Sequence, residues 1–377
     1  LGVRMGVPWF QLKELARKHG IIALSSNYTL YADMSNRVMG LLAACSPKQE
    51  VYSIDECFLE LTGFEHLGLV AYGQTFREII QRQVGLPVCV GMASTKTLAK
   101  LANHVAKKHV EYSGVCDFTG FDASSLDDLL SQIEVGEIWG VGPRIAPRLQ
   151  AMGIHSVRDL KRAPPAKIRQ QFSVVLERTV AELNGEACIA LEDIAPAKQQ
   201  IMSSRSFGVP VFALAELEQS VASYTARAAI KLRQQASLAG AIQVYIRTSP
   251  FRVKDPQYSQ GITIPLPMPT SDSRSLVGAA LAGLKRIFKP GFAYAKSGIM
   301  LMSLIPQDHR ELTLFDDPIQ LNRSSALMGV MDRINGNFGK GAIRLCGEGA
   351  DQRWKMQAGN KSPHYTTRIS DLVVAKA

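Results

Sequence analysis

Hydrophobic and polar positions in the first 120 residues follow the periods of helices and strands in turn. Leu30, Met34 and Val38 recur at helical spacing. The stretch EVYSIDECFLEL alternates like a half-buried strand and contains a turn. We expect a helix, a strand pair, a helix, a strand and a helix, at residues 29–45, 50–61, 70–85, 86–93 and 94–108. This order predicts an α+β layer.

The pattern changes beyond residue 120. Residues 121–190 predict short helices separated by Gly and Pro, with almost no strand signal. Residues 200–305 predict strand, helix, strand, strand, helix and strand, the split βαββαβ arrangement. After residue 306 the chain becomes polar, and we expect loops with short helical pieces there.

Length and composition narrow the class of protein. A chain of 377 residues is too long for one ordinary core and predicts two to four domains. Its 43 Lys and Arg against 33 Asp and Glu give a formal charge of +10, which favours a polyanion such as nucleic acid or describes a merely basic enzyme. Six scattered cysteines without a CxxC pair make a zinc site unexpected and favour a reducing cytoplasm. No apolar run is long enough to predict a membrane segment.

Two adjacent carboxylates are the first candidate for chemistry. Asp55 and Glu56 lie within the apolar, β-forming stretch 50–61, so we expect them in the core, where unpaired carboxylates are costly. A tight turn between Ile54 and Cys57 would bring both to one side. Two carboxylates beside a phosphate-bearing substrate suit Mg²⁺. An acidic pair is also common in turns and at solvated strand edges.

A basic helix face is the second candidate. Lys96, Lys100, Asn103 and Lys107 step by four, three and four residues and therefore share one face of a helix. Residues 92–110 contain no acid. Such a face is usually only solvated. Beside a carboxylate and metal site it would hold a triphosphate or a DNA backbone.

A glycine-rich turn within IWGVGPRIAPRLQAMGI, residues 138–154, is the third candidate. Gly140 and Gly142 precede a helix start, and Gly153 supplies a second turn, as in a helix-hairpin-helix. One acid, Asp159, accompanies seven basic residues between 139 and 170: Arg144, Arg148, Arg158, Lys161, Arg162, Lys167 and Arg169. We expect phosphate binding without sequence readout.

The fourth candidate is RELTLFDD, residues 310–317. Leu312, Leu314 and Phe315 would be apolar anchors on a polar segment that docks into a partner's groove. A tail that folds back on its own domain fits the spacing equally well.

These motifs together resemble one family. YSIDECFLEL resembles the catalytic signature of the Y-family, or lesion-bypass, DNA polymerases, and the basic helix and glycine-rich turn follow it in the family's order. The resemblance covers the whole chain. Within the family, the chain most resembles the UmuC-like catalytic subunits of bacterial DNA polymerase V, because of the segments NYTLYADMSNRVM, VVLERTVAELNGE, SSRSFG, IRTSPF and SPHYTTRISDL.

The resemblance implies a right-hand polymerase layout, with partial fingers and palm. It places a fingers remnant at 1–27, an incomplete palm at 28–120, a helix-hairpin-helix thumb at 121–198, a βαββαβ little finger at 199–305 and a C-terminal tail at 306–377. The implied reaction is two-metal phosphoryl transfer from a dNTP to a primer 3′-OH opposite damaged template, in SOS-type repair and mutagenesis.

The resemblance also implies roles for single residues. Asp55 and Glu56 would bind two Mg²⁺ ions, with Mn²⁺ as a substitute, and Lys107 and Lys100 would contact the nucleotide. We expect DNA contacts at Gly140, Gly142, Arg144, Arg148, Arg205 and Arg247. ELTLF resembles a sliding-clamp motif in which Glu311 stands where Gln is usual. A UmuD-like dimer and a RecA filament are further implied partners.

The start of the chain departs from the family pattern. Members begin with a palm strand that carries a third metal-binding Asp, followed by fingers residues that bind the triphosphate, and LGVRMGVPWF opens beyond that point. We therefore expect a fragment with weak or no polymerase activity. Two alternatives remain open: a non-catalytic protein that binds damaged DNA, and an interaction subunit of the mutasome.

Overall fold

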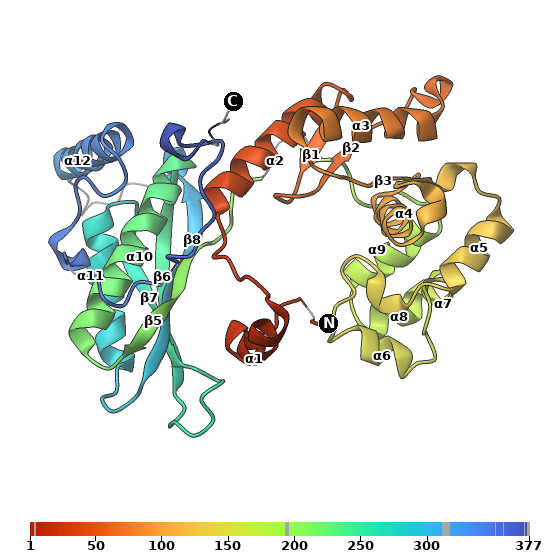
Figure 1. Cartoon of the computed structure of the whole chain (residues 1–377). Helices are drawn as coiled ribbons and strands as arrows, with labels where there is room; N and C mark the ends of the chain where they lie inside the picture. Colours follow the sequence, from red (N-terminus) through yellow and green to blue (C-terminus); the bar gives the residue numbers. More distant parts are fainter. Residues whose placement is uncertain are drawn as a thin grey trace. The chain divides into compact units, whose positions relative to one another are not determined.

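The computed structural model describes residues 1–3, 5–192, 196–310, 317–350, 352–356, 358–372 and 374 (Figure 1). The chain divides into two compact units. Unit 1 comprises residues 1–195 together with 361–377, and unit 2 comprises residues 196–360.

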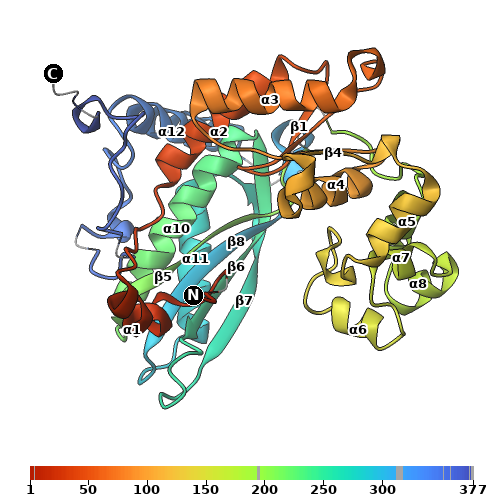
Figure 2. The ribbon, with the colours of Figure 1, turned by 45° about the vertical axis from the view of Figure 1, so that its right-hand side comes forward.

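Unit 1 is mixed α/β in its first part and helical afterwards. The helices predicted at 29–45, 70–85 and 94–108 are confirmed as α2, α3 and α4. Residues 121–190 form short helices, as the Gly and Pro pattern indicates (Figure 2). The elements are α1 (Trp9–His19), α2 (Tyr28–Ala43), β1 (Gln49–Val51), β2 (Cys57–Leu59), α3 (Leu69–Val84), β3 (Val90–Met92), α4 (Lys96–Lys108), β4 (Val115–Asp117), α5 (Ala123–Ser131), α6 (Ala146–Gln150), α7 (Val157–Lys161), α8 (Pro165–Gln171) and α9 (Val174–Leu183).

Two small strand pairs position the helices of unit 1. β1 and β2 form an antiparallel hairpin in which Glu50 lies opposite Phe58. β3 and β4 pair in parallel. Gly91 of β3 lies so close to α4 that a Cβ atom would be 2.0 Å from the backbone nitrogen of Asn103. Only glycine permits this approach, which fixes α4 against β3.

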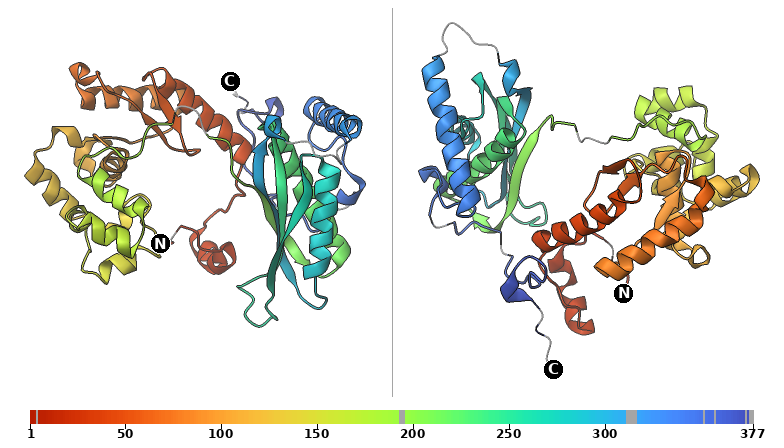
Figure 3. Two further views of the ribbon diagram at one scale, coloured as in Figure 1. Left: turned by 180° about the vertical axis from the view of Figure 1, so that it is seen from behind. Right: turned by 90° about the horizontal axis from the view of Figure 1, so that it is seen from above.

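Unit 2 confirms the predicted βαββαβ order. Its elements are β5 (Ile201–Val211), α10 (Leu214–Gln234), β6 (Ser237–Thr248), β7 (Ser259–Thr270), α11 (Ser273–Ile287), β8 (Tyr294–Pro306) and α12 (Pro318–Asn337). The sheet has the order β5-β8-β6-β7 with antiparallel neighbours, and α10 and α11 cover one face (Figure 3). Ile242, Val244 and Ile246 of β6 are fully buried on the covered face.

The expectation of loops after residue 306 is wrong for residues 318–337, which form the 20-residue helix α12. Only Met328 of this helix is buried, so no apolar stripe marks it in the sequence. Its start is nevertheless encoded, because Asp317 accepts hydrogen bonds from the backbone of Ile319 and Gln320 and Pro318 occupies the first turn.

A bidentate ion pair attaches α12 to α10, and its loss is expected to destabilise the packing of α12 on α10. Arg233 donates to both oxygens of Asp332 at 2.6 and 2.7 Å, and its side chain is 15% exposed. We expect Arg233→Met to cost about 2 kcal/mol, because the half-buried Asp332 loses its cation. Hydrogen exchange of α12 measures the effect.

Lys285→Met is the matched control for this substitution. Lys285 forms an exposed pair with Glu218 at 3.5 Å, which is expected to contribute less than about 1 kcal/mol. Equal exchange rates of α12 in the two variants would contradict the expectation.

Candidate functional site

The two predicted carboxylates lie at the turn of the β1–β2 hairpin. Ser53 donates its backbone N–H to the carbonyl of Glu56 at 3.3 Å, which closes the turn. Asp55 is exposed and hydrogen-bonded to the Ser53 hydroxyl, and the Glu56 side chain is 37% exposed. The expectation that both acids are in the core is therefore wrong. The predicted strand pair is confirmed as the two three-residue strands β1 and β2, and the acids occupy the turn between them.

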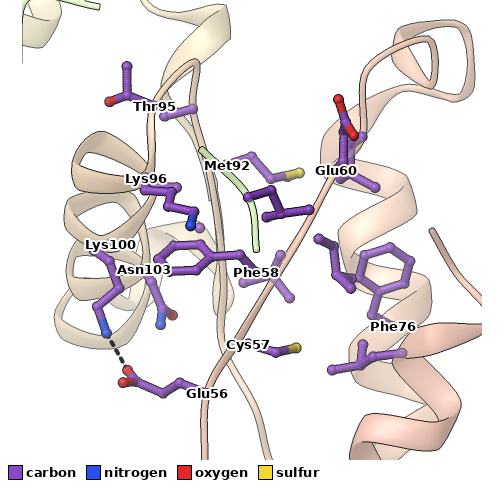
Figure 4. A pocket seen from close by; sticks show the side chains of 18 of the residues that line it. Glu56, Cys57, Phe58, Glu60, Phe76, Met92, Thr95, Lys96, Lys100 and Asn103 are labelled. Carbon is purple, nitrogen blue, oxygen red and sulfur yellow. Dashed lines mark hydrogen bonds and ion pairs between the residues drawn. The ribbon is translucent and has the colours of Figure 1, made fainter. Parts of the chain in front are cut away.

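Glu56 is held by Lys100 and Tyr52. The Lys100 ammonium lies 2.5 Å from one carboxylate oxygen (Figure 4). The Tyr52 hydroxyl donates to the other oxygen at 2.7 Å. Partial burial raises the pKa of Glu56, but the hydrogen bonds from Lys100 and Tyr52 outweigh it, so the pKa is lower than usual. Burial and the adjoining Glu56 raise the pKa of Tyr52. Glu56 is thus an anion and Tyr52 a neutral donor at neutral pH.

A second, more buried ion pair lies one helical turn away on α4. Lys96 pairs with Glu50 of β1, and these side chains are only 8% and 13% exposed. Lys96 also donates to the carbonyl of Ala190 at 2.7 Å, and Glu50 accepts from the backbone N–H of Glu192. The pair therefore joins α4, the hairpin and the segment that follows α9.

The ammonium groups of Lys96 and Lys100 both lie over aromatic rings. Tyr52 and Phe58 stack at 4.9 Å between ring centroids, and Trp139 lies within 5.8 Å of each ring. Lys96 lies over Phe58 at 5.1 Å and Lys100 over Tyr52 at 5.4 Å. Cation–π attraction therefore adds to the ion pairs in fixing the ammonium groups.

Glu182 of α9 is a functional candidate that the sequence patterns do not indicate. It is fully buried, and four donors use its two oxygens. One oxygen accepts from the backbone N–H and the hydroxyl of Thr97 at 2.9 and 2.8 Å. The other accepts from the backbone N–H groups of Cys188 and Ile189, both at 3.0 Å. Glu182 therefore joins the first turn of α4 to residues 188–189.

The β1–β2 hairpin and α4 line a cleft of about 660 Å³. Side chains from α2, β2, α3, β3, α4 and residues 187–191 line it, and Asp55, Glu56, Lys96, Lys100 and Asn103 are among them. In Figure 4, Phe58 points toward α4 while Cys57 points toward Phe76 on α3. The Oδ1 atom of Asn103 is buried without a hydrogen-bond partner. The cleft is apolar inside and charged where Glu56 meets Lys100.

The other residues of the predicted basic face and glycine-rich turn lie on the surface. Lys107 is exposed in the last turn of α4. Gly140 adopts a φ of 88°, which favours glycine, and α6 begins four residues after Gly142. Arg144 is exposed, whereas Arg148 stacks on Phe172 at 4.5 Å and donates to the carbonyl of Gln171.

The two predicted DNA contacts of unit 2 are not brought together. Arg247 lies opposite Lys296, on the face of the sheet away from the helices. Arg205 lies opposite Ser297, whose buried hydroxyl bonds to Ser220 of α10, so it belongs to the helix-covered face at the edge strand. Leu312, Leu314 and Phe315 lie outside the described residues.

Within the described ranges, no three His, Cys, Asp or Glu side chains gather in a way that could hold a metal ion. No helix in the same ranges is long and apolar enough to cross a membrane.

The fold defines the class of protein. The chain matches a Y-family DNA polymerase chimera, Dbh-Dpo4(243-245)-Dbh, with a TM-score of 0.62 and 19% sequence identity over 81% of this chain and 85% of that one. The chain therefore has the fold of the Y-family DNA polymerases, which agrees with the predicted fold class.

The sequence then defines the family. Residues 1–104 match the impB/mucB/samB family, residues 198–314 match its C-terminal domain, and residues 325–375 match a domain of unknown function, DUF4113. Protein UmuC and Protein SamB, both of Salmonella typhimurium, are each 45% identical over all of this chain and 89% of their own length. The chain belongs to the impB/mucB/samB family.

Proposed function

We propose that this protein is a DNA-directed DNA polymerase of error-prone translesion synthesis, which adds deoxynucleotides to a primer 3′-OH opposite damaged template. Family membership and the Y-family fold support the reaction class. One observation carries the assignment of the site: the two carboxylates of a hairpin turn line one cleft together with Lys96 and Lys100 of α4, and Glu56 pairs directly with Lys100. Acidic and basic groups in one cleft suit a metal-bound triphosphate.

Asp55 and Glu56 supply the kind of donor set that Mg²⁺ takes. Mg²⁺ takes one or two protein carboxylates and otherwise substrate phosphates and water. Asp55 and Glu56 are adjacent, partly exposed and close enough for the charge of Asp55 to raise the pKa of Glu56. They fit two ions, or Mn²⁺ in their place, that are held mainly by substrate. Bound there, the metal would offset charge on the triphosphate and lower the pKa of the primer hydroxyl.

The protein's own residues would orient the nucleotide and the DNA. Lys100 and Lys107 share a face of α4 and would bind phosphates of the incoming dNTP. Tyr52 holds Glu56 by a neutral hydrogen bond. In the proposed thumb, the backbone at Gly140 and Gly142 with Arg144 and Arg148 would contact the DNA backbone. In the proposed little finger, Arg247 would do so from the face of the sheet away from the helices, with Lys296 beside it, and Arg205 would do so separately, from the edge strand β5.

We infer that residues 1–27 form a fingers remnant, 28–120 the palm, 121–198 the thumb, 199–305 the little finger and 306–377 the tail. The sliding clamp, through Leu312, Leu314 and Phe315, a UmuD-like dimer and a RecA filament are the proposed protein partners. The proposed setting is SOS mutagenesis in the cytoplasm.

Single-nucleotide incorporation into a labelled primer tests the proposal. We expect weak incorporation that needs a template and Mg²⁺, follows the templating base, and persists opposite an abasic site. The measurement is a gel assay with each dNTP in turn, alongside DNA binding by fluorescence anisotropy. Binding without incorporation on any template would instead favour a non-catalytic subunit that binds damaged DNA.

A further inference from the structure

The last described residues of the chain belong to unit 1, although the preceding 165 residues form unit 2. Residues 361–372 lie against the start of α2, more than 300 residues earlier in the chain. The two segments meet in a parallel β-bridge between Ser25 and Lys361. The chain therefore joins the two units at two places, near residue 195 and near residue 360.

Asn27 makes the central contact. Its side chain is 1% exposed, and it is the N-cap residue of α2. The Oδ1 atom accepts from the backbone N–H of Leu30, as a helix cap does. The Nδ2 atom donates to the Ser362 carbonyl at 3.0 Å, with the Ser362 hydroxyl and the Pro363 carbonyl at 3.2 and 3.4 Å. One amide thus caps a helix and binds the C-terminal segment.

A second contact lies one and a half turns further along α2. Asp33 accepts a hydrogen bond from Arg37 at 2.9 Å, and the Thr366 side chain lies near enough to be the largest cause of the lowered pKa of Asp33. Asp33 and Asn27 therefore contact the segment at separate points, which fixes its direction along the helix.

The C-terminal segment is itself a closed loop. The backbone N–H of His364 donates to Asp371 at 3.0 Å, and those of Thr367 and Arg368 donate to the carbonyl of His364. A closed loop loses less conformational entropy on docking than an open tail would. The segment is thus preorganised for the surface on which it lies.

We propose that the first turns of α2 are a docking site for the chain's own residues 361–372. The groups of α2 that face this segment are a buried amide and a carboxylate. The site gives the end of the DUF4113 region a binding role. The proposal concerns docking alone and does not depend on polymerase activity.

Engineered cysteines test the docking in the full chain. Cα atoms paired in a β-bridge lie within the range that a disulfide spans. We expect Ser25→Cys with Lys361→Cys to form a disulfide, identified by mass spectrometry because six native cysteines are present. The control is Asn36→Cys with Lys361→Cys, since Asn36 is exposed and about 13 Å further along α2. Equal yields in both pairs, or no disulfide in a folded first pair, would overturn the proposal.

Asn27→Asp separates docking from helix capping. An aspartate still caps α2, but it cannot donate to Ser362 and Pro363. Added to the Ser25→Cys and Lys361→Cys pair, it is expected to lower the disulfide yield about tenfold without loss of helix by circular dichroism. An unchanged yield would contradict the role of Asn27. Exchange of residues 361–372 in the unaltered chain gives an independent check, because free-segment rates there would also refute docking.

Discussion

Glu56→Gln is expected to slow nucleotide incorporation at least about a hundredfold, the usual cost of removing a group that acts on charge developing in a reaction. The substitution keeps the shape of the side chain and removes the negative charge that Lys100 faces at 2.5 Å. Asp55→Asn should have a similar effect, because the same turn presents both groups. Affinity for primer-template DNA should stay within about twofold, since phosphate contacts by Lys and Arg dominate it. Single-turnover incorporation and anisotropy measure the two quantities.

Glu78→Gln is the matched control for these variants. Glu78 is an exposed acid on α3 and is not among the cleft residues. Incorporation by this variant should equal that of the unaltered chain. If Glu56→Gln and Asp55→Asn also incorporate at the unaltered rate, the hairpin turn is not the reaction site. If they lose DNA binding as well, the turn is part of a DNA-binding surface.

Regular periodicity made much of the fold predictable. The order of unit 2 follows from strands that alternate on a one-sided sheet and from two helices with wide apolar faces, such as that of α11. In the same way, Leu98, Leu101, Ala102 and Val105 mark the buried side of α4 and leave Lys100 on the other. Patterns that bury one face can be recognised because burial of apolar surface is what holds them.

Features that depend on polar contacts or on register were not predictable. Polar contacts attach helix α12, among them Arg233 with Asp332, which lie 99 residues apart, and only Met328 of the helix is buried, so it shows no apolar stripe. The separation of Arg205 from Arg247 follows from the register of β8 against its two neighbours, where a one-residue shift changes the face. The exposure of Asp55 follows from its place in the turn of the predicted strand pair, which the apolar residues on either side do not indicate.

Glu182 belongs to the same class of unpredicted features, and its replacement carries the second large expected effect. Thr97 and Glu182 are 85 residues apart, and a Glu inside the helical pattern of α9 gives no sign of burial. In Glu182→Gln, one oxygen becomes an NH₂ group facing backbone N–H donors. Unpaired buried donors cost about 1–3 kcal/mol each, so we expect α4 and residues 187–192 to lose about 2 kcal/mol of local stability.

Hydrogen exchange of the intact chain measures this loss. Peptides of α4 and residues 187–192 should exchange about thirtyfold faster, while peptides of β6 and β8 in unit 2 stay unchanged as an internal reference. Thr97→Val removes only the hydroxyl donor and should give a smaller increase. Glu186→Gln, an exposed residue four positions later, is the matched control. Exchange in Glu182→Gln equal to that in Glu186→Gln would mean that α4 is positioned by Gly91 and the apolar core alone.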